Sequence, residues 1–361
     1  MRIAILGFAK VKYMPYLHFY LNQLDLQKHD VHLLYWKRDK DPDVPLPKGV
    51  TGYVFDCPIV DTMPIRTKLP KFLRYGNFAK RTLKRIQPDF LIVMLATTAI
   101  TIYPLLMGKY RNRYILDYRD VTYEGNRIYQ SAVANIIKNS VLSFTSSDGF
   151  RKYLPETEKL LTSHNLMKDL LARKVSDAKP FHTPIRVSFW GLLRHKKVNQ
   201  LLIDRLAGDN RFELHYYGRA QGSMLTMVQE AERQYNNVFY HGEYRPSEIP
   251  DLAAKTDLLH NIYDTGDRTM PVAMSNKYYE GILFKIPLLC SNGSLMGKMS
   301  QEKGVGLACD PNTEDFANKL YSYYVNLDNK RFSENCDQEL ERILIEMESG
   351  NQAVQKALHN I

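Results

Sequence analysis

The sequence predicts an α/β protein made of two doubly wound domains, each with a parallel sheet covered by helices on both faces. Short apolar runs alternate with helical patterns over most of the 361 residues. Several of these runs are apolar on both faces, as the strands of a covered parallel sheet must be. A polar stretch with two prolines interrupts the alternation near the middle. The length also exceeds that of one average domain.

Strands are expected in two groups. In the first half they are expected at 2–8, 31–36, 51–57, 89–96, 113–119, 141–147 and 159–164. In the second half they are expected at 185–192, 212–218, 238–243, 258–263, 286–291 and 305–309. The predicted domains are therefore 1–165 and 185–330, joined by a linker at 166–184 that contains Pro180 and Pro184. Residues 331–361 read as helical, without another strand.

Composition limits the class of protein. No run of 18 or more apolar residues occurs, so no membrane-spanning helix is expected. The apolar stretch at the N-terminus is too short for a signal peptide and reads as a first strand. Four cysteines, Cys57, Cys290, Cys309 and Cys336, lack metal or disulfide spacing, which suits a reducing cytoplasm. A formal charge of +10 favours an anionic partner.

Doubly wound sheets bind ligands at the carboxyl ends of their strands, so the functional residues are expected at strand-to-helix junctions. The first such junction, "LGFAKVKY", contains only Gly7. A nicotinamide-binding fingerprint needs three glycines there, and no Walker-type loop occurs elsewhere. The sequence therefore argues against a dehydrogenase and against a P-loop enzyme.

The second domain opens with "FWGLLRHKKVNQLL", residues 189–202. Its strand is expected to end at Gly191, and Arg194, Lys196 and Lys197 crowd the loop before the next helix. Cations beside a helix N-terminus make a site for a diphosphate, although a solvated basic loop explains them equally well. Gly218 in "YYGRAQGS" and Gly242 in "FYHGEY" repeat the strand-end glycine.

The stretch "SNKYYEGILFKIPLL", residues 275–289, places Lys277 and Glu280 one turn apart at the start of a helix. The unpaired N–H groups and positive dipole end of that helix would attract an anion. Lys277 would add a cation to the same site, and Glu280 could accept hydrogen bonds from paired sugar hydroxyls. The alternative is an ordinary amphipathic helix with Glu280 at its surface.

These segments, together with "EKGVGLACDP" (302–311), "QPDFLIVMLATTA" (87–99), "YILDYRD" (114–120) and "SHN" (163–165), resemble the GT-B glycosyltransferases. The likeness is to the family 4-like, group 1 retaining transferases of bacterial surface-polysaccharide synthesis. It covers nearly the whole chain. It is specific for fold and class, and it does not indicate which sugar is transferred.

The resemblance implies two Rossmann-like domains that face a central cleft, with the C-terminal helices packing back on the first domain and a hinge near 166–184. It implies that Arg194 and Lys197 hold the donor diphosphate and stabilise its departure, and that Glu280 binds the ribose. The implied catalytic residues are Asp120, Arg194 and Lys197; the implied donor-binding residues are Gly191, Gly218, Gly242, Tyr244, Ser275, Asn276, Lys277 and Glu280; and the implied acceptor-side residues are Lys12, Tyr13, Asp117 and Arg119. No cofactor and no metal ion are expected, because fixed cations and a helix end would replace a metal.

The sequence departs from the family pattern at three places. The family's usual glutamate eight residues before Glu280 is Val272, and the arginine that often follows the strand-end glycine is Leu192. The glycine pair after the first strand is replaced by Lys10, Lys12 and Tyr13. Recognition of the donor sugar is therefore expected to differ.

Residues 66–88 carry eight Lys and Arg side chains and no acid. An apolar face is expected from Leu69, Phe72, Leu73, Gly76, Ala79, Leu83 and Ile86, which fall at helical spacing. This pattern fits contact with an anionic membrane surface, or a core helix with a solvated basic face. No nucleic-acid-binding motif accompanies the charge, so nucleic acid is not expected as a partner.

The function predicted is therefore a cytoplasmic glycosyltransferase, peripheral to the inner face of the plasma membrane. It would move a sugar from a nucleotide-sugar, with UDP slightly favoured, to a lipid-linked saccharide of a capsule, exopolysaccharide or O-antigen. One alternative is an inactive GT-B-like scaffold or binding protein. The other is a nucleotide-sugar 2-epimerase, which the order of the motifs fits poorly.

Overall fold

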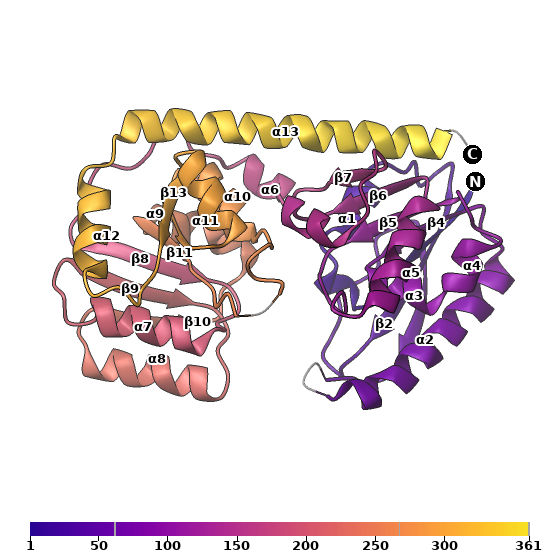
Figure 1. Ribbon diagram of the computed structural model, residues 1–361, viewed down its shortest axis with the longest axis horizontal. Helices are drawn as coiled ribbons and strands as arrows, with labels where there is room; N and C mark the ends of the chain where they lie inside the picture. The colour runs from indigo at the N-terminus through magenta and orange to yellow at the C-terminus, as the bar shows by residue number, and fades with distance from the viewer. Residues whose placement is uncertain (61–62, 267, 360–361) are drawn as a thin grey trace. The chain divides into compact units, whose positions relative to one another are not determined.

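A computed structural model describes residues 1–60, 63–266 and 268–359. The chain divides into two compact units (Figure 1). Unit 1 comprises Met1–His164 and Ile345–Ile361, and unit 2 comprises Asn165–Leu344. Within the described residues no helix is long and apolar enough to cross a membrane.

Unit 1 contains a seven-stranded sheet in the order β3-β2-β1-β4-β5-β6-β7, and all of its pairs are parallel. Its central strands are buried along their whole length, because helices cover both faces of a doubly wound sheet. The strands are β1 (Arg2–Leu6), β2 (Asp30–Lys37), β3 (Val50–Asp56), β4 (Phe90–Met94), β5 (Tyr114–Tyr118), β6 (Leu142–Thr145) and β7 (Leu160–Thr162).

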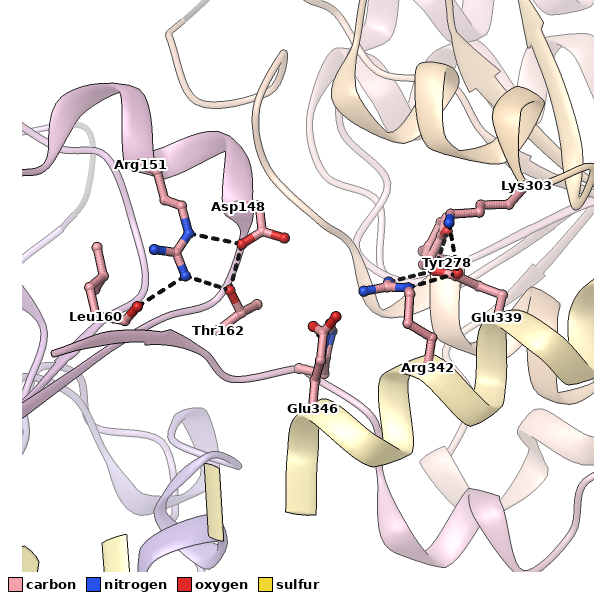
Figure 2. Close-up of polar contacts among 10 residues, drawn as sticks. Asp148, Arg151, Leu160, Thr162, Tyr278, Lys303, Glu339, Arg342 and Glu346 are labelled. Atoms are coloured by element: carbon pink, nitrogen blue, oxygen red, sulfur yellow. Dashed lines mark hydrogen bonds and ion pairs between the residues drawn. The ribbon is translucent and has the colours of Figure 1, made fainter. Parts of the chain in front are cut away.

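The helices of unit 1 follow its strands. They are η1 (Val11–Tyr13), α1 (Leu17–Leu21), α2 (Ile65–Ile86), α3 (Ala96–Thr101), α4 (Tyr103–Met107), α5 (Arg127–Lys138) and η2 (Asp148–Tyr153). Arg151 of η2 donates to Asp148 Oδ1 and to the carbonyl of Leu160, each over 3.0 Å, and so ties this turn to β7 (Figure 2).

Unit 2 contains a six-stranded parallel sheet in the order β10-β9-β8-β11-β12-β13. Relative to its first strand this is the order 3-2-1-4-5-6 of a dinucleotide-binding fold. The strands are β8 (Ile185–Trp190), β9 (Phe212–Tyr217), β10 (Val238–Gly242), β11 (Leu258–Asn261), β12 (Leu288–Ser291) and β13 (Gly306–Cys309).

The helices of unit 2 are α6 (Lys168–Leu171), α7 (Lys196–Leu206), α8 (Ser223–Gln234), η3 (Pro246–Glu248), α9 (Ile249–Ala254), α10 (Asn276–Leu283), α11 (Leu295–Glu302) and α12 (Phe316–Val325). Alternate residues of β9, such as Phe212 and Leu214, join the core with Leu202 of α7 and Val228 of α8. The last helix, α13 (Asn329–His359), contributes to both units.

Every expected strand is present, most of them shorter than predicted, and the predicted α/β class with two doubly wound sheets is confirmed. The segment 166–184, which was predicted as a linker, contains α6 and belongs to unit 2. Lys179 in this segment donates to the carbonyl of Ala253 at the end of α9. The helical tail is one continuous helix, and its Val354, Ala357 and Leu358 lie in the core of unit 1.

The structure also changes the expected apolar face of α2. Gly76, Ala79, Leu83 and Ile86 are buried as expected. Leu69 and Leu73 are not, and they expose 53% and 62% of their surface. Phe72 is partly buried and packs its ring against Phe8 and Trp36, so the apolar residues of α2 reach the core from Phe72 onward, apart from Leu73.

Candidate functional site

The candidate site lies at the carboxyl ends of β8 and β11, the neighbouring strands at which the strand order of unit 2 reverses. Chain connections leave such a pair of strands in opposite directions, and this opens a crevice for ligands. After β8 the chain enters the loop that begins at Gly191 and leads to α7. After β11 it runs through Tyr263 towards Ser275 and α10.

Two glycines shape this edge of the sheet. Gly191 has φ +133° and Gly218 has φ +129°, a region that favours glycine. A Cβ atom at Gly218 would lie 1.8 Å from the carbonyl oxygen of Gly191, so no other residue fits without moving the backbone. The two strand ends therefore approach each other with their backbones bare of side chains.

Lys277 in the first turn of α10 points towards Gly191. A Cβ atom at Gly191 would lie 3.2 Å from the Lys277 Nζ. The Nζ donates to the Tyr263 hydroxyl over 3.1 Å and lies 4.2 Å from the centre of the Phe189 ring. Lys277 is 8% exposed, and no carboxylate of the described residues forms an ion pair with it. The edge of the sheet thus holds a buried cation that forms no ion pair with a carboxylate of the described residues.

The start of α10 adds to the positive potential. Ser275 is the N-cap residue, but its hydroxyl donates to the Asn261 side chain over 2.8 Å and does not cap the helix. Asn276 is exposed in the first turn. Backbone N–H groups of an uncapped first turn are available to an anion.

Glu280 lies inside the site, which excludes the alternative of a surface glutamate. Its Oε2 accepts a hydrogen bond of 2.6 Å from the Trp190 indole, and the residue is 5% exposed. Burial raises the pKa of Glu280, and the nearby Lys277 and the Trp190 bond only partly offset that effect. Within the described chain, Oε1 of Glu280 accepts no hydrogen bond, so one oxygen remains for a ligand.

Tyr244 lies near Glu280 at the end of the β10 loop. Burial, followed by the charge of Glu280, raises the pKa of the Tyr244 hydroxyl well above its usual range. The hydroxyl is therefore a neutral hydrogen-bonding group. Gly242, two residues earlier, has φ +74° and open space where a Cβ would be.

Arg194 and Lys197 are exposed on the loop and on the first turn of α7. Asn199 holds this loop by donating to the carbonyls of Arg194 and His195. Its own oxygen contacts the His260 Nε2 over 3.2 Å. Burial lowers the pKa of His260 to about 3, with further effects from Lys277 and His195, so this histidine is neutral.

The arrangement can bind an anion larger than a single carboxylate. Lys277, the α10 N-terminus and the glycine backbones form its floor, and Arg194 and Lys197 belong to the adjoining loop. A diphosphate carries enough charge to use several of these groups at once. Glu280 supplies the acceptor expected for hydroxyl groups.

The two departures noted in the sequence have different surroundings. Val272 is buried, and its N–H donates to the carbonyl of Thr269. Leu192 is 52% exposed on the loop after Gly191. The structure therefore offers no carboxylate at 272 and no guanidinium at 192.

In unit 1 the loop after β1 is fixed by aspartates. The buried Lys10 pairs with Asp39, and Asp43 accepts hydrogen bonds from the N–H groups of Val11 and Lys12. The Lys12 Nζ lies 4.9 Å from the centre of the Tyr13 ring, which is 52% exposed. Lys12 and Tyr13 thus lie after the first strand on a loop that Asp39 and Asp43 hold in place.

The aspartates at 39, 41 and 43 form an Asp-x-Asp spacing, which the expectation of a metal-free site did not take into account. Asp39 and Asp43 are engaged as described above. In the part of the chain that the structure describes, no group of three His, Cys, Asp or Glu side chains could hold a metal. That the site works without a metal ion stays a prediction.

Asp117 and Arg119, at the end of β5, are largely internal. Asp117 is fully buried and pairs with the Arg119 Nε over 2.7 Å. Arg119 also donates to the Ser163 hydroxyl and lies 4.7 Å from the centre of the Tyr16 ring. Asp117 therefore holds Arg119 in place, whereas Asp120 is exposed.

Four residues that build the site were not predicted from the sequence: Phe189, Trp190, His195 and Tyr263. The Tyr263 hydroxyl accepts from Lys277, and its ring lies 5.2 Å from that of His195. Each of the four falls at the end of a predicted strand or in the loop that follows it. That position was the available signal, but an aromatic residue there reads as part of the core.

No protein-family model matches the chain, and no curated protein matches it in sequence. Solved structures do match. Sucrose-phosphate synthase from Thermosynechococcus elongatus is similar at TM-score 0.72 and 11% identity, over 100% of both chains. Anabaena HepE in complex with UDP is similar at TM-score 0.65 and 14% identity, also over 100% of both chains.

The lipopolysaccharide outer core galactosyltransferase WaaB is similar at TM-score 0.68 and 15% identity, over 98% of this chain and 99% of WaaB. A putative UDP-N-acetylglucosamine 2-epimerase from Listeria monocytogenes is also similar, at TM-score 0.56 and 10% identity, over 93% and 91% of the chains. At such identities the likeness concerns the fold. The fold is that of the GT-B glycosyltransferases, and an epimerase shares it.

Proposed function

We propose that this chain is a retaining glycosyltransferase that takes its sugar from a nucleotide-diphosphate sugar. The observation that carries the proposal is the buried Lys277, which lies beside the bare backbone of Gly191 at the switch point of unit 2 and forms no ion pair with a carboxylate among the described residues. A buried charge is costly unless it is paired. An anionic ligand would supply the missing partner.

The donor would use the rest of the site in a consistent way. Arg194, Lys197 and Lys277 bind the diphosphate, and the free oxygen of Glu280 accepts from the ribose hydroxyls. The base lies against the Gly218, Gly242 and Tyr244 segment, and the donor sugar meets the backbone near Ser275 and Asn276. UDP is favoured as the nucleotide, and UDP complexes of the structurally similar HepE support that choice.

Electrostatics supply most of the rate in this account. When the bond between sugar and diphosphate breaks, negative charge grows on the leaving group. Lys277 is buried and held beside that position, so it needs little reorganisation to stabilise this charge, and the exposed Arg194 and Lys197 can join it. These three cations take the place of a metal ion, so activity is expected in the presence of a chelator.

The acceptor would meet residues at the strand ends of unit 1. Asp120 is exposed there and orients the acceptor hydroxyl, while Arg119, held by Asp117, Lys12 and Tyr13 contact the saccharide. We assign the acceptor to the lipid-linked saccharides of capsule, exopolysaccharide or O-antigen synthesis. The similarity to WaaB supports that class.

A lipid-linked acceptor requires contact with a membrane, and α2 offers a suitable surface. Ile65, Leu69 and Leu73 lie four residues apart on this helix and are about half exposed or more. Arg66 and Arg74 are exposed beside them, and residues 66–88 contain no acid. Apolar side chains flanked by cations suit an anionic lipid surface, and this supports a location at the inner face of the plasma membrane.

Incubation with UDP-glucose, UDP-galactose and UDP-N-acetylglucosamine, without an acceptor, tests the proposal. Slow hydrolysis to UDP and free sugar, in the presence of EDTA, is the expected result. Release of sugar with retained anomeric configuration, followed by NMR, would support the retaining mechanism. Binding without turnover would favour the scaffold alternative, and conversion of the sugar without release of UDP would identify an epimerase.

A further inference from the structure

Helix α10 carries Lys277 and Glu280, and hydrogen bonds at both of its ends join it to helix α13. The Tyr278 hydroxyl donates a hydrogen bond of 2.9 Å to Oε1 of Glu339 in α13. Just beyond the other end of α10, the Lys285 Nζ donates to Asp337 over 2.7 Å. Both contacts lie within unit 2, so α13 fixes α10 at its first turn and behind its last.

Glu339 is a buried acid built into this contact. It is 2% exposed, and Arg342 donates to its two oxygens over 2.6 and 2.9 Å. Lys303 lies 3.9 Å from its Oε2. In Figure 2 the side chains of Tyr278, Arg342 and Lys303 converge on the Glu339 carboxylate. A carboxylate at such a depth needs these partners, because burial of an unpaired charge is strongly unfavourable.

The contact lies directly beside the proposed donor site. Tyr278 follows Lys277 in the sequence and precedes Glu280 by two residues. It is fully buried, and α10 has only eight residues. A shift of the Tyr278 ring therefore moves the first turn of α10, and with it the Lys277 ammonium and the Glu280 carboxylate.

We propose that Glu339 is a positioning residue of the donor site, which acts through Tyr278 to hold the first turn of α10 against the strand ends. This inference rests on the proposed function, because it assigns a nucleoside diphosphate to that turn. Neither Glu339 nor Tyr278 would touch the ligand. Their effect is on the geometry of Lys277 and Glu280.

The test measures nucleotide affinity by calorimetry for the full chain and for Tyr278→Phe, Glu339→Ala and the double variant. The probe is whichever of UDP, GDP, dTDP, ADP and CMP stabilises the wild-type protein most. Each single variant is expected to bind it about 3- to 10-fold more weakly, the scale of coupling through packed networks. The double variant should bind no more weakly than Glu339→Ala. Both changes remove the same hydrogen bond, the one between Tyr278 and Glu339, so their effects should not add. Near-ultraviolet circular dichroism confirms that each variant is folded.

Glu341→Gln is the matched control, since Glu341 lies on the same helix, is exposed and forms no hydrogen bond or ion pair with the described residues of α10. It should leave affinity unchanged. Glu339→Gln adds a second check, because its amide oxygen can still accept from Tyr278. Glu339→Gln should lower the stability of the protein and keep most of its nucleotide affinity. If Glu339 were merely structural, every variant would change the stability and none would change the affinity.

Two results would overturn the inference, and they are distinct. If the wild type binds the nucleotide and folded Tyr278→Phe and Glu339→Ala bind it equally well, the positioning role is wrong and the proposed function stands. If the wild type binds none of the five nucleotides, the proposed donor site fails and the inference falls with it.

Discussion

Lys277 and Glu280 hold opposite charges one helical turn apart, and their surroundings treat these charges differently. Lys277 sits over the Phe189 ring and donates to a neutral hydroxyl. Glu280 is buried against Trp190, and burial raises its pKa. The fold therefore stabilises the charged forms of both side chains only in part. Functional sites often keep groups that lower the stability of the fold, because these groups are used in binding or catalysis.

The first residue-scale prediction concerns Glu280→Gln. A carboxyl with a raised pKa binds its proton more tightly in the folded state, so the free energy of unfolding falls as the pH rises from about 4.5 through the folded pKa. Glutamine can keep the bond from Trp190 and removes this penalty. The variant should be more stable than the wild type at pH 7, by thermal unfolding, and should lose that advantage near pH 4.

The same variant should bind the donor nucleotide roughly 10- to 100-fold more weakly, since hydrogen bonds to a charged group contribute about 1.5–3 kcal/mol. Calorimetry with UDP and with UMP checks this. Unchanged affinity for both would show that Glu280 does not contact the ribose.

The second residue-scale prediction concerns Lys277→Met, which keeps the length and apolar stem of the side chain. Affinity for UDP should fall about 10-fold or more, because a charge-assisted contact to phosphate is lost. Affinity for uridine, which has no phosphate, should not change. Equal losses for UDP and uridine would mean that the lysine supports the pocket and does not bind the diphosphate.

At the scale of elements, the site depends on strands that end in glycine. Gly218 meets the Gly191 carbonyl so closely that Gly218→Ala would force the two strand ends apart. We expect a loss of roughly 2 kcal/mol or more in the free energy of unfolding, from the clash and the positive φ together. Urea unfolding followed by tryptophan fluorescence measures it.

Gly242→Ala provides the control for this prediction. Gly242 also has positive φ, but nothing lies within 4 Å of the position of its Cβ. Its cost should be limited to backbone strain, about 1 kcal/mol. If the two alanine variants lose equal stability, close approach at Gly218 is not what requires glycine there.

The second element-scale prediction concerns α2. Replacement of Leu69 and Leu73 by serine should weaken binding to phosphatidylglycerol vesicles roughly 10-fold, because two exposed leucines no longer enter the lipid. Binding of the wild type should also weaken with salt, as cations on the same helix face are screened. The matched control is Ile128→Ser, at an exposed isoleucine on α5. Vesicle sedimentation that gives the same result for all three proteins would remove α2 from the membrane account.

At the scale of the whole molecule, the fold was largely predictable and the site only in part. The strands could be placed because buried parallel strands are apolar on both faces, a pattern that few other structures produce. Glu280 and Lys277 could be placed at a helix start by their spacing. Trp190 as the partner of Glu280 could not, because that hydrogen bond joins residues 90 positions apart and depends on how α10 packs.

Two other features could not be predicted from the sequence, for similar reasons. The segment 166–184 is polar and contains prolines, and yet Lys179 binds the end of α9 and the N–H of Ala178 donates to Ser333. Asp117 reads as a strand-end carboxylate, but it is fully buried with Arg119. The type of a residue indicates whether it tends to be exposed or buried. The tertiary contact that reverses this tendency cannot be read from the sequence.

Helix α13 contributes residues to both units. It runs from Asn329 to His359 without a break, binds α10 through Glu339 in unit 2, and fills the core of unit 1 with Val354, Ala357 and Leu358. The helix that anchors the proposed donor site is therefore also a core element of the other unit.

The most direct test of the central claim is a thermal-shift screen of the purified protein against UDP, GDP, dTDP, ADP and CMP, repeated with Glu280→Ala. The account predicts that one nucleoside diphosphate stabilises the wild type and that this stabilisation is lost in the variant. Stabilisation by none of the five nucleotides, or an equal shift in both proteins, would contradict the donor site described here.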